Sequence, residues 1–117
     1  MVQNQLSLVI AEVLDEKKAE DIVILDLRGR SNLTDYVVIA TGLNERHAAS
    51  LAHHVEKTLS AQGEEIHHKE GHRTGDWVVL DYVNVIVHIF NEDKRNYYDL
   101  ERLWSDAPKL VPAFLTA

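Results

Sequence analysis

The chain has 117 residues, of which 45% are hydrophobic and 26% charged, and it contains no cysteine. This size and composition predict one globular domain, and the lack of cysteine excludes disulfides, thiol catalysis and thiolate metal sites. The formal net charge of −7 argues against non-specific nucleic-acid binding, because phosphates attract basic surfaces. With no signal-peptide pattern and no apolar run near the ~18 residues of a membrane span, we expect a cytoplasmic protein.

The first half of the chain predicts two helices and two strands. Apolar side chains three and four residues apart indicate an amphipathic helix over residues 4 to 18. Short apolar runs predict buried strands at 22–27 and 36–40. Asn44 is a favourable N-cap for a second helix that runs to about Gln62. These elements predict an α/β arrangement.

The second half is organised around a predicted hairpin. Residues 64–69 indicate a polar edge strand, and the runs 77–81 and 85–90 flank a short connection at 82–84. Alternation along the first run places Trp77, Val79 and Asp81 on one face of the sheet. Since these strands otherwise favour Val and Ile, the large or polar residues Trp77, Asp81 and His88 are the first candidates for a recognition surface.

The C-terminal part predicts one more helix, with Tyr97, Leu100, Leu103 and Trp104 on its buried side. Pro108 and Pro112 are expected to end regular structure. The economical architecture is a single-layer mixed β-sheet of about five strands packed with helices. We expect one domain over residues 1–107 and a C-terminal tail over 108–117.

Motifs for catalysis or metal binding are weak. The paired histidines and His72 are more often surface residues than zinc ligands, because neighbouring side chains on a strand or helix diverge. No glycine-rich phosphate cradle and no nucleophile elbow occur in the sequence. Gly29-Arg30-Ser31 with Asp35 is reminiscent of a nucleotidyltransferase site, but such a site needs clustered carboxylates. We therefore expect no enzyme, no metal and no cofactor.

Several separated segments point to a known family. They are DYVVIATG at 35–42, EG at 70–71, WVVLD at 77–81, VHIF at 87–90, RNYY at 95–98 and LERLW at 100–104. In order and spacing they resemble the ribosomal silencing factor family, also called Iojap-like, over roughly residues 4 to 107. The family commonly has Gly-Asp where this chain has Val83-Asn84.

The resemblance implies a small, often dimeric α/β protein whose fold is similar to that of nucleotidyltransferases without their paired catalytic acids. It implies binding to the large ribosomal subunit, at the ribosomal protein numbered fourteen, and a block of subunit joining when nutrients are short. From the sequence itself we expect no membrane partner and no direct sequence-specific nucleic acid. The alternatives are a nucleotidyltransferase-like enzyme and a generic dimeric interaction module.

Charge and aromatic residues suggest where a partner binds. Residues 76–106 carry seven acidic and three basic side chains, a local charge of −4, which suits a basic protein partner. Aromatic anchors among acids are typical of binding hot spots. The predicted partner-binding residues are Trp77, Asp81, His88, Tyr98, Asp99 and Glu101. For Trp77, Tyr98 and Trp104 the alternative is plain core packing.

Overall fold

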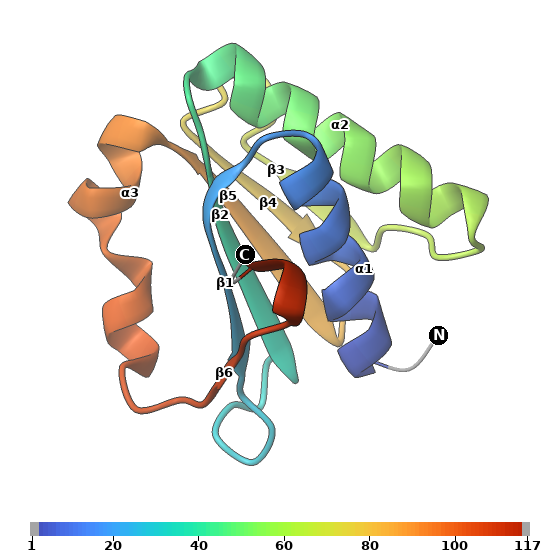
Figure 1. The fold of residues 1–117 in the computed structure, drawn as a ribbon, viewed down its shortest axis with the longest axis vertical. Helices are drawn as coiled ribbons and strands as arrows, with labels where there is room; N and C mark the ends of the chain where they lie inside the picture. Colours follow the sequence, from blue (N-terminus) through green and yellow to red (C-terminus); the bar gives the residue numbers. More distant parts are fainter. Residues whose placement is uncertain (1–2, 116–117) are drawn as a thin grey trace.

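The computed structural model describes residues 3–115 as one open β-sheet with helices on both faces (Figure 1). In chain order the elements are α1 (Gln3–Glu16), β1 (Glu20–Asp26), β2 (Tyr36–Gly42), α2 (Glu45–Ala61), β3 (His68–Glu70), β4 (Trp77–Asp81), β5 (Val85–Asn91), α3 (Glu92–Tyr98), η1 (Leu100–Trp104), β6 (Lys109–Leu110) and η2 (Ala113–Leu115). The strand order is β3-β4-β5-β2-β1-β6. Within residues 3–115, β2 and β5 are the only parallel neighbours, so the predicted mixed sheet is confirmed, with a sixth strand.

Helices α1 and α2 cover one face of the sheet (Figure 1). The predicted start of α2 is confirmed, because Asn44 Oδ1 accepts a 2.8 Å hydrogen bond from the His47 amide. The residues of α2 that face the sheet are fully buried: Ala48, Leu51, Ala52, Val55 and Leu59. Within residues 3–115 no helix is both long and apolar enough to cross a membrane.

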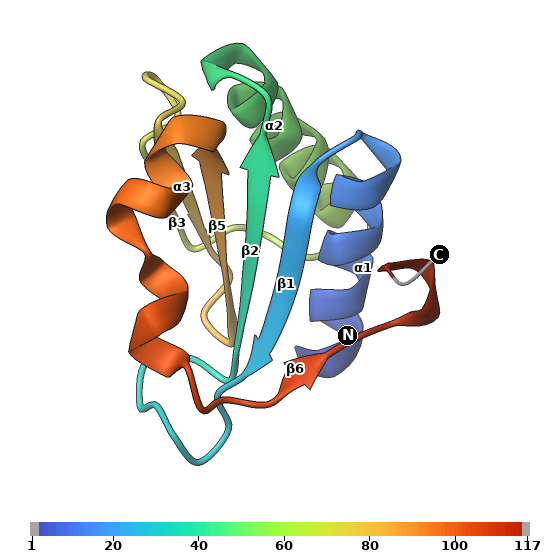
Figure 2. The ribbon, with the colours of Figure 1, turned by 60° about the vertical axis from the view of Figure 1, so that its left-hand side comes forward.

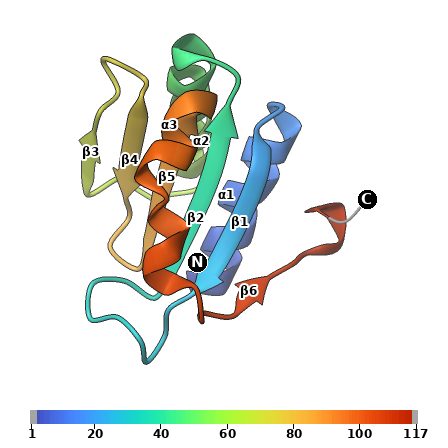
Figure 3. The same ribbon diagram turned by 90° about the vertical axis from the view of Figure 1, so that its left-hand side faces the viewer.

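The other face carries a smaller cover made of α3 and η1 (Figure 2). Leu100 and Trp104 of η1 pack against a second core that contains Leu25, Val37 and Phe90. Figure 3 shows α3 and η1 crossing β5 and β2, while β3 and β4 lie beyond them without a helix in front. Part of this sheet face is therefore left uncovered.

The predicted single C-terminal helix is wrong. Asp99 adopts a left-handed conformation (φ 46°), which ends α3 after Tyr98 and starts η1. Because this break changes the direction of the chain, helical spacing across it no longer describes one face. Tyr97 and Leu103, expected on the buried side, are 77% and 71% exposed, whereas Leu100 and Trp104 do pack on the core.

Regular structure also continues past Pro108, which corrects the second C-terminal prediction. Lys109 and Leu110 pair with Leu25 and Ile24 as β6, and the Pro108 carbonyl accepts a 2.9 Å hydrogen bond from the Asp26 amide. Proline stops a strand only where its missing N–H is required, and edge positions tolerate it. Strand β6 therefore covers part of the outer edge of β1.

Candidate functional site

Four rings meet on the partly covered sheet face, at the end of the β4–β5 hairpin nearest α3. The Trp77 ring is central, with centroid distances of 5.0 Å to Phe90, 4.6 Å to Tyr98 and 5.9 Å to His88. The strand register pairs Trp77 with Phe90, so both side chains lie on the same face. Tyr98 reaches the cluster from the last turn of α3.

A hydrogen bond orients the half-buried Trp77 ring. The indole Nε1–H donates to Nδ1 of His88 at 3.0 Å, so the neutral imidazole carries its proton on Nε2. Burial lowers the pKa of His88 to about 4, which keeps the ring uncharged near neutral pH. Trp77 is thus fixed by Phe90 behind it and His88 beside it.

We call the uncovered part of this sheet the open face, formed by Trp77, Val79, Asp81, Ile86, His88 and Tyr98. The five strand residues are half-buried, and Tyr98 is 45% exposed. Apolar and aromatic groups left partly exposed in this way are typical of interaction sites. The structure therefore brings four of the six predicted binding residues onto one surface.

Asp81 lies at the far end of the open face, where it fixes the hairpin turn. Its Oδ1 accepts a 2.7 Å hydrogen bond from the Val83 amide. The carboxylate keeps its negative charge when it accepts this bond, so Asp81 can also contribute charge to the surface. Asp81 therefore has a local structural role in addition to the predicted binding role.

The structure places Asp99 and Glu101 away from this surface. Asp99 forms the exposed corner between α3 and η1. Glu101 Oε1 accepts a 3.0 Å hydrogen bond from Arg95 Nε, and this pair turns toward β1. The prediction that these acids bind the partner together with Trp77 requires an interface that also covers this corner.

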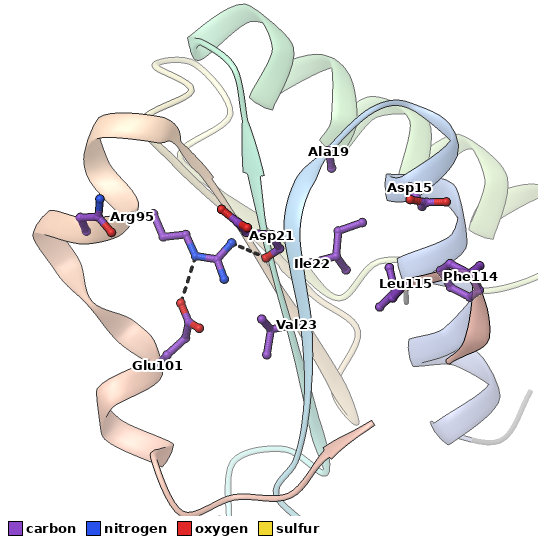
Figure 4. A pocket seen from close by; sticks show the side chains of 10 residues that line it. Asp15, Ala19, Asp21, Ile22, Val23, Arg95, Glu101, Phe114 and Leu115 are labelled. Carbon is purple, nitrogen blue, oxygen red and sulfur yellow. Dashed lines mark hydrogen bonds and ion pairs between the residues drawn. The ribbon is translucent and has the colours of Figure 1, made fainter. Parts of the chain in front are cut away.

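Arg95 and Glu101 line a groove of about 620 Å³ beside β1, which also contains Asp15, Asp21 and Phe114 (Figure 4). Arg95 donates to Glu101, to Thr41 Oγ1 at 2.8 Å and to the backbone carbonyl of Asp21. Since the guanidinium donates hydrogen bonds to β1 and β2, its main role is to hold α3 against these two strands.

Two residues that support the open face were not predicted from the sequence. Phe90 is fully buried behind Trp77, a position that the hairpin register alone would have indicated. Asn91 caps α3 by accepting a 3.0 Å hydrogen bond from the Lys94 amide. The Asn91 amide group also donates to Asp76 Oδ1 at 3.0 Å. This buried asparagine directs α3, and hence Tyr98, toward the open face.

The histidines and Asp35 are the residues considered for metal binding and nucleotide transfer. Over residues 3–115, no three His, Asp or Glu side chains gather so as to hold a metal ion. Asp35 is half-buried beside β2, and its amide donates to the Asn84 carbonyl at 3.1 Å. This position joins two loops of the fold.

Comparison with known proteins identifies the family. The family described as "Ribosomal silencing factor during starvation" matches residues 2–116. The chain belongs to the ribosomal silencing factor family. A ribosomal silencing factor from Halalkalibacterium halodurans is 39% identical over 108 residues, which are 92% of each chain.

Two further matches are a solved structure and a mouse protein. A crystal structure of a Chromobacterium violaceum protein matches with a TM-score of 0.87 and 34% identity, covering 97% of this chain and 93% of that one. A mouse relative named "Mitochondrial assembly of ribosomal large subunit protein 1" is 27% identical over 82% of this chain and 43% of its own length.

Proposed function

We propose that this protein represses translation by binding the large ribosomal subunit through the open face and blocking the joining of the small subunit. The observation that carries the proposal is the Trp77 cluster: a large aromatic ring, held by His88 and Phe90, at an uncovered sheet surface. Rigid aromatic side chains bind at low entropic cost and dominate interface energetics. Family membership and the name of the mouse relative support a ribosomal partner.

The charge of the chain supports a basic partner protein, for which we propose the large-subunit protein numbered fourteen. Half-buried Asp81 lies on the open face, and Glu70 of β3 is exposed beside Val79, with which it pairs. Exposed charges around an aromatic centre steer association and set register, and their effect falls as salt rises. Affinity for the subunit should therefore decrease with ionic strength.

Sedimentation through sucrose tests the proposal. The protein is mixed with purified large subunits at low and at high salt, and small subunits are added in a parallel set. We expect co-sedimentation at low salt, weaker binding at high salt and fewer joined ribosomes when the protein is present. Protein that stays at the top of every gradient, or magnesium-dependent nucleotide turnover that Asp35→Asn abolishes, would contradict the proposal.

We also propose that the free protein is a homodimer. The three-residue strand β3 forms one end of the sheet and pairs with β4 on one side, so its other edge is available to a second copy. Light scattering should give a dimer mass at micromolar concentration. A monomer mass across that range would exclude the dimer without affecting the binding proposal.

A further inference from the structure

The turn of the β4–β5 hairpin holds a β-branched residue in a conformation that such residues rarely adopt. Val83 has a φ of 73°, a positive value that Gly, Asn and Asp adopt more readily than a residue with a branched Cβ. The Asn84 amide donates to the Tyr82 carbonyl at 2.9 Å. Val83 is therefore the central residue of a γ-turn of the strained, positive-φ kind.

Hydrogen bonds from three directions hold this turn in place. The Asp81 carboxylate accepts from the Val83 amide at 2.7 Å, and the Tyr82 amide donates to the Val85 carbonyl at 2.9 Å. The Asn84 carbonyl accepts two further N–H groups, at 3.1 Å, from the chain that leads into β2. A strained residue persists only where its surroundings determine the conformation in this way.

Packing inside the fold does not offset this strain, because the Val83 side chain is 53% exposed. The turn directly follows the pair formed by Asp81 and Ile86, which ends the open face. Val83 is therefore an exposed apolar residue in the turn that adjoins this end of the open face. Strained residues that gain no burial are concentrated at functional sites.

We propose that Val83 is a partner-contact residue, whose isopropyl group the turn holds outward so that it enters an apolar depression on the protein that covers the open face. The inference rests on the proposed function, since it uses the same partner and the same surface. It adds a second anchor at the opposite end of the face from Trp77. Contacts at both ends of the open face would fix the orientation of the partner relative to the β4–β5 hairpin.

Val83→Asn tests the proposal, because it should relieve backbone strain and so raise stability, while it removes the apolar contact and so weakens binding. Asn tolerates a positive φ better than a β-branched residue does and retains the backbone N–H that donates to Asp81, so the melting temperature should rise by about 4 °C. Loss of the apolar contact should weaken binding to purified large subunits by about ten-fold. Val83→Gly removes the side chain altogether and should weaken binding equally.

Val111→Asn is the matched control, since Val111 is 62% exposed just beyond β6, at the opposite edge of the sheet. It should change neither melting nor binding. Val83 variants that bind as tightly as the wild type overturn the inference and leave the proposed function intact. A wild-type protein that does not bind large subunits overturns both.

Discussion

The indole Nε1–H of Trp77 donates a 3.0 Å hydrogen bond to Nδ1 of His88, across the two strands of the central hairpin. The bond joins the largest side chain of the open face to a histidine whose pKa burial lowers to about 4. Protonation of His88 would remove the acceptor and release the indole. The orientation of the proposed anchor therefore depends on a neutral imidazole.

Stability should fall in mildly acidic solution because of His88. Burial lowers the pKa of His88 from 6.5 to about 4 in the folded protein, so between these values the unfolded chain binds more protons. The stabilisation is complete above pH 6.5 and is lost as the pH falls toward 4. Linkage gives a loss of about 2 kcal/mol between pH 7 and pH 5, measurable by urea unfolding.

His88→Gln separates this contribution from that of the other histidines. The glutamine amide oxygen still accepts from Trp77 but does not titrate, so this variant should lose about 2 kcal/mol less than the wild type over the same pH interval. His53→Gln, at an exposed position of α2, should behave as the wild type. Equal pH dependence in all three proteins would show that His88 is not the group responsible.

Asp81 has two roles that substitution can separate. Asp81→Asn keeps an oxygen for the Val83 amide and removes the charge, so folding should be nearly unchanged while the salt dependence of subunit binding weakens. Asp81→Ala also removes the turn hydrogen bond and should destabilise by about 1 kcal/mol more. Thermal melts and binding at two salt concentrations distinguish the variants. Identical salt dependence in Asp81→Asn and wild type would remove the electrostatic role.

Arg95 should act as a structural tie between α3 and the sheet. Arg95→Met leaves Glu101 and the Asp21 carbonyl without their donor and should destabilise by about 2 kcal/mol. Hydrogen exchange in α3 should then rise more than in β5. Arg95→Lys retains the charge but not the fork of donors, and it should give an intermediate effect. Unchanged exchange in α3 would contradict this role.

Tyr82 carries a hydroxyl that the fold does not use. The residue is 7% exposed, and its oxygen has no hydrogen-bond partner among residues 3–115. Burial raises the pKa of the Tyr82 hydroxyl well above its usual range. Tyr82→Phe should stabilise by about 1 kcal/mol, because an unpaired polar group is removed from the core. A lower denaturation midpoint would instead indicate a partner such as a bound water.

Most of the architecture could be predicted from the sequence, because the periodic spacing of apolar residues follows which side chains are buried. Alternation placed Trp77 and Asp81 on one face of β4, and helical spacing identified the buried side of α2. The errors lie where one residue changes the direction of the chain. The left-handed Asp99 divides the last helix, and Pro108 precedes a strand instead of ending regular structure. The spacing of apolar residues in the sequence reveals neither feature.

The candidate site was predicted less completely. Trp77, Asp81, His88 and Tyr98 share the open face, whereas Glu101 is engaged by Arg95 on the other side of α3. Charge counting along the chain could not separate these acids, because it ignores the direction in which each side chain points. The bond between Trp77 and His88 depends on strand register, which composition does not report.

The affinity of purified large subunits for Trp77→Ala shows whether the open face binds the large subunit. The measurement uses conditions in which thermal melts show the variant to be fully folded, since removing the half-buried ring also destabilises the protein. Tyr98→Ala and Tyr97→Ala form a matched pair, because Tyr98 contacts Trp77 whereas Tyr97 is 77% exposed.

We predict that Trp77→Ala loses about 2 kcal/mol or more of binding free energy, roughly thirty-fold in affinity, that Tyr98→Ala loses less, and that Tyr97→Ala binds as the wild type. A folded Trp77→Ala variant that binds large subunits as tightly as the wild type would show that the open face is not the binding surface.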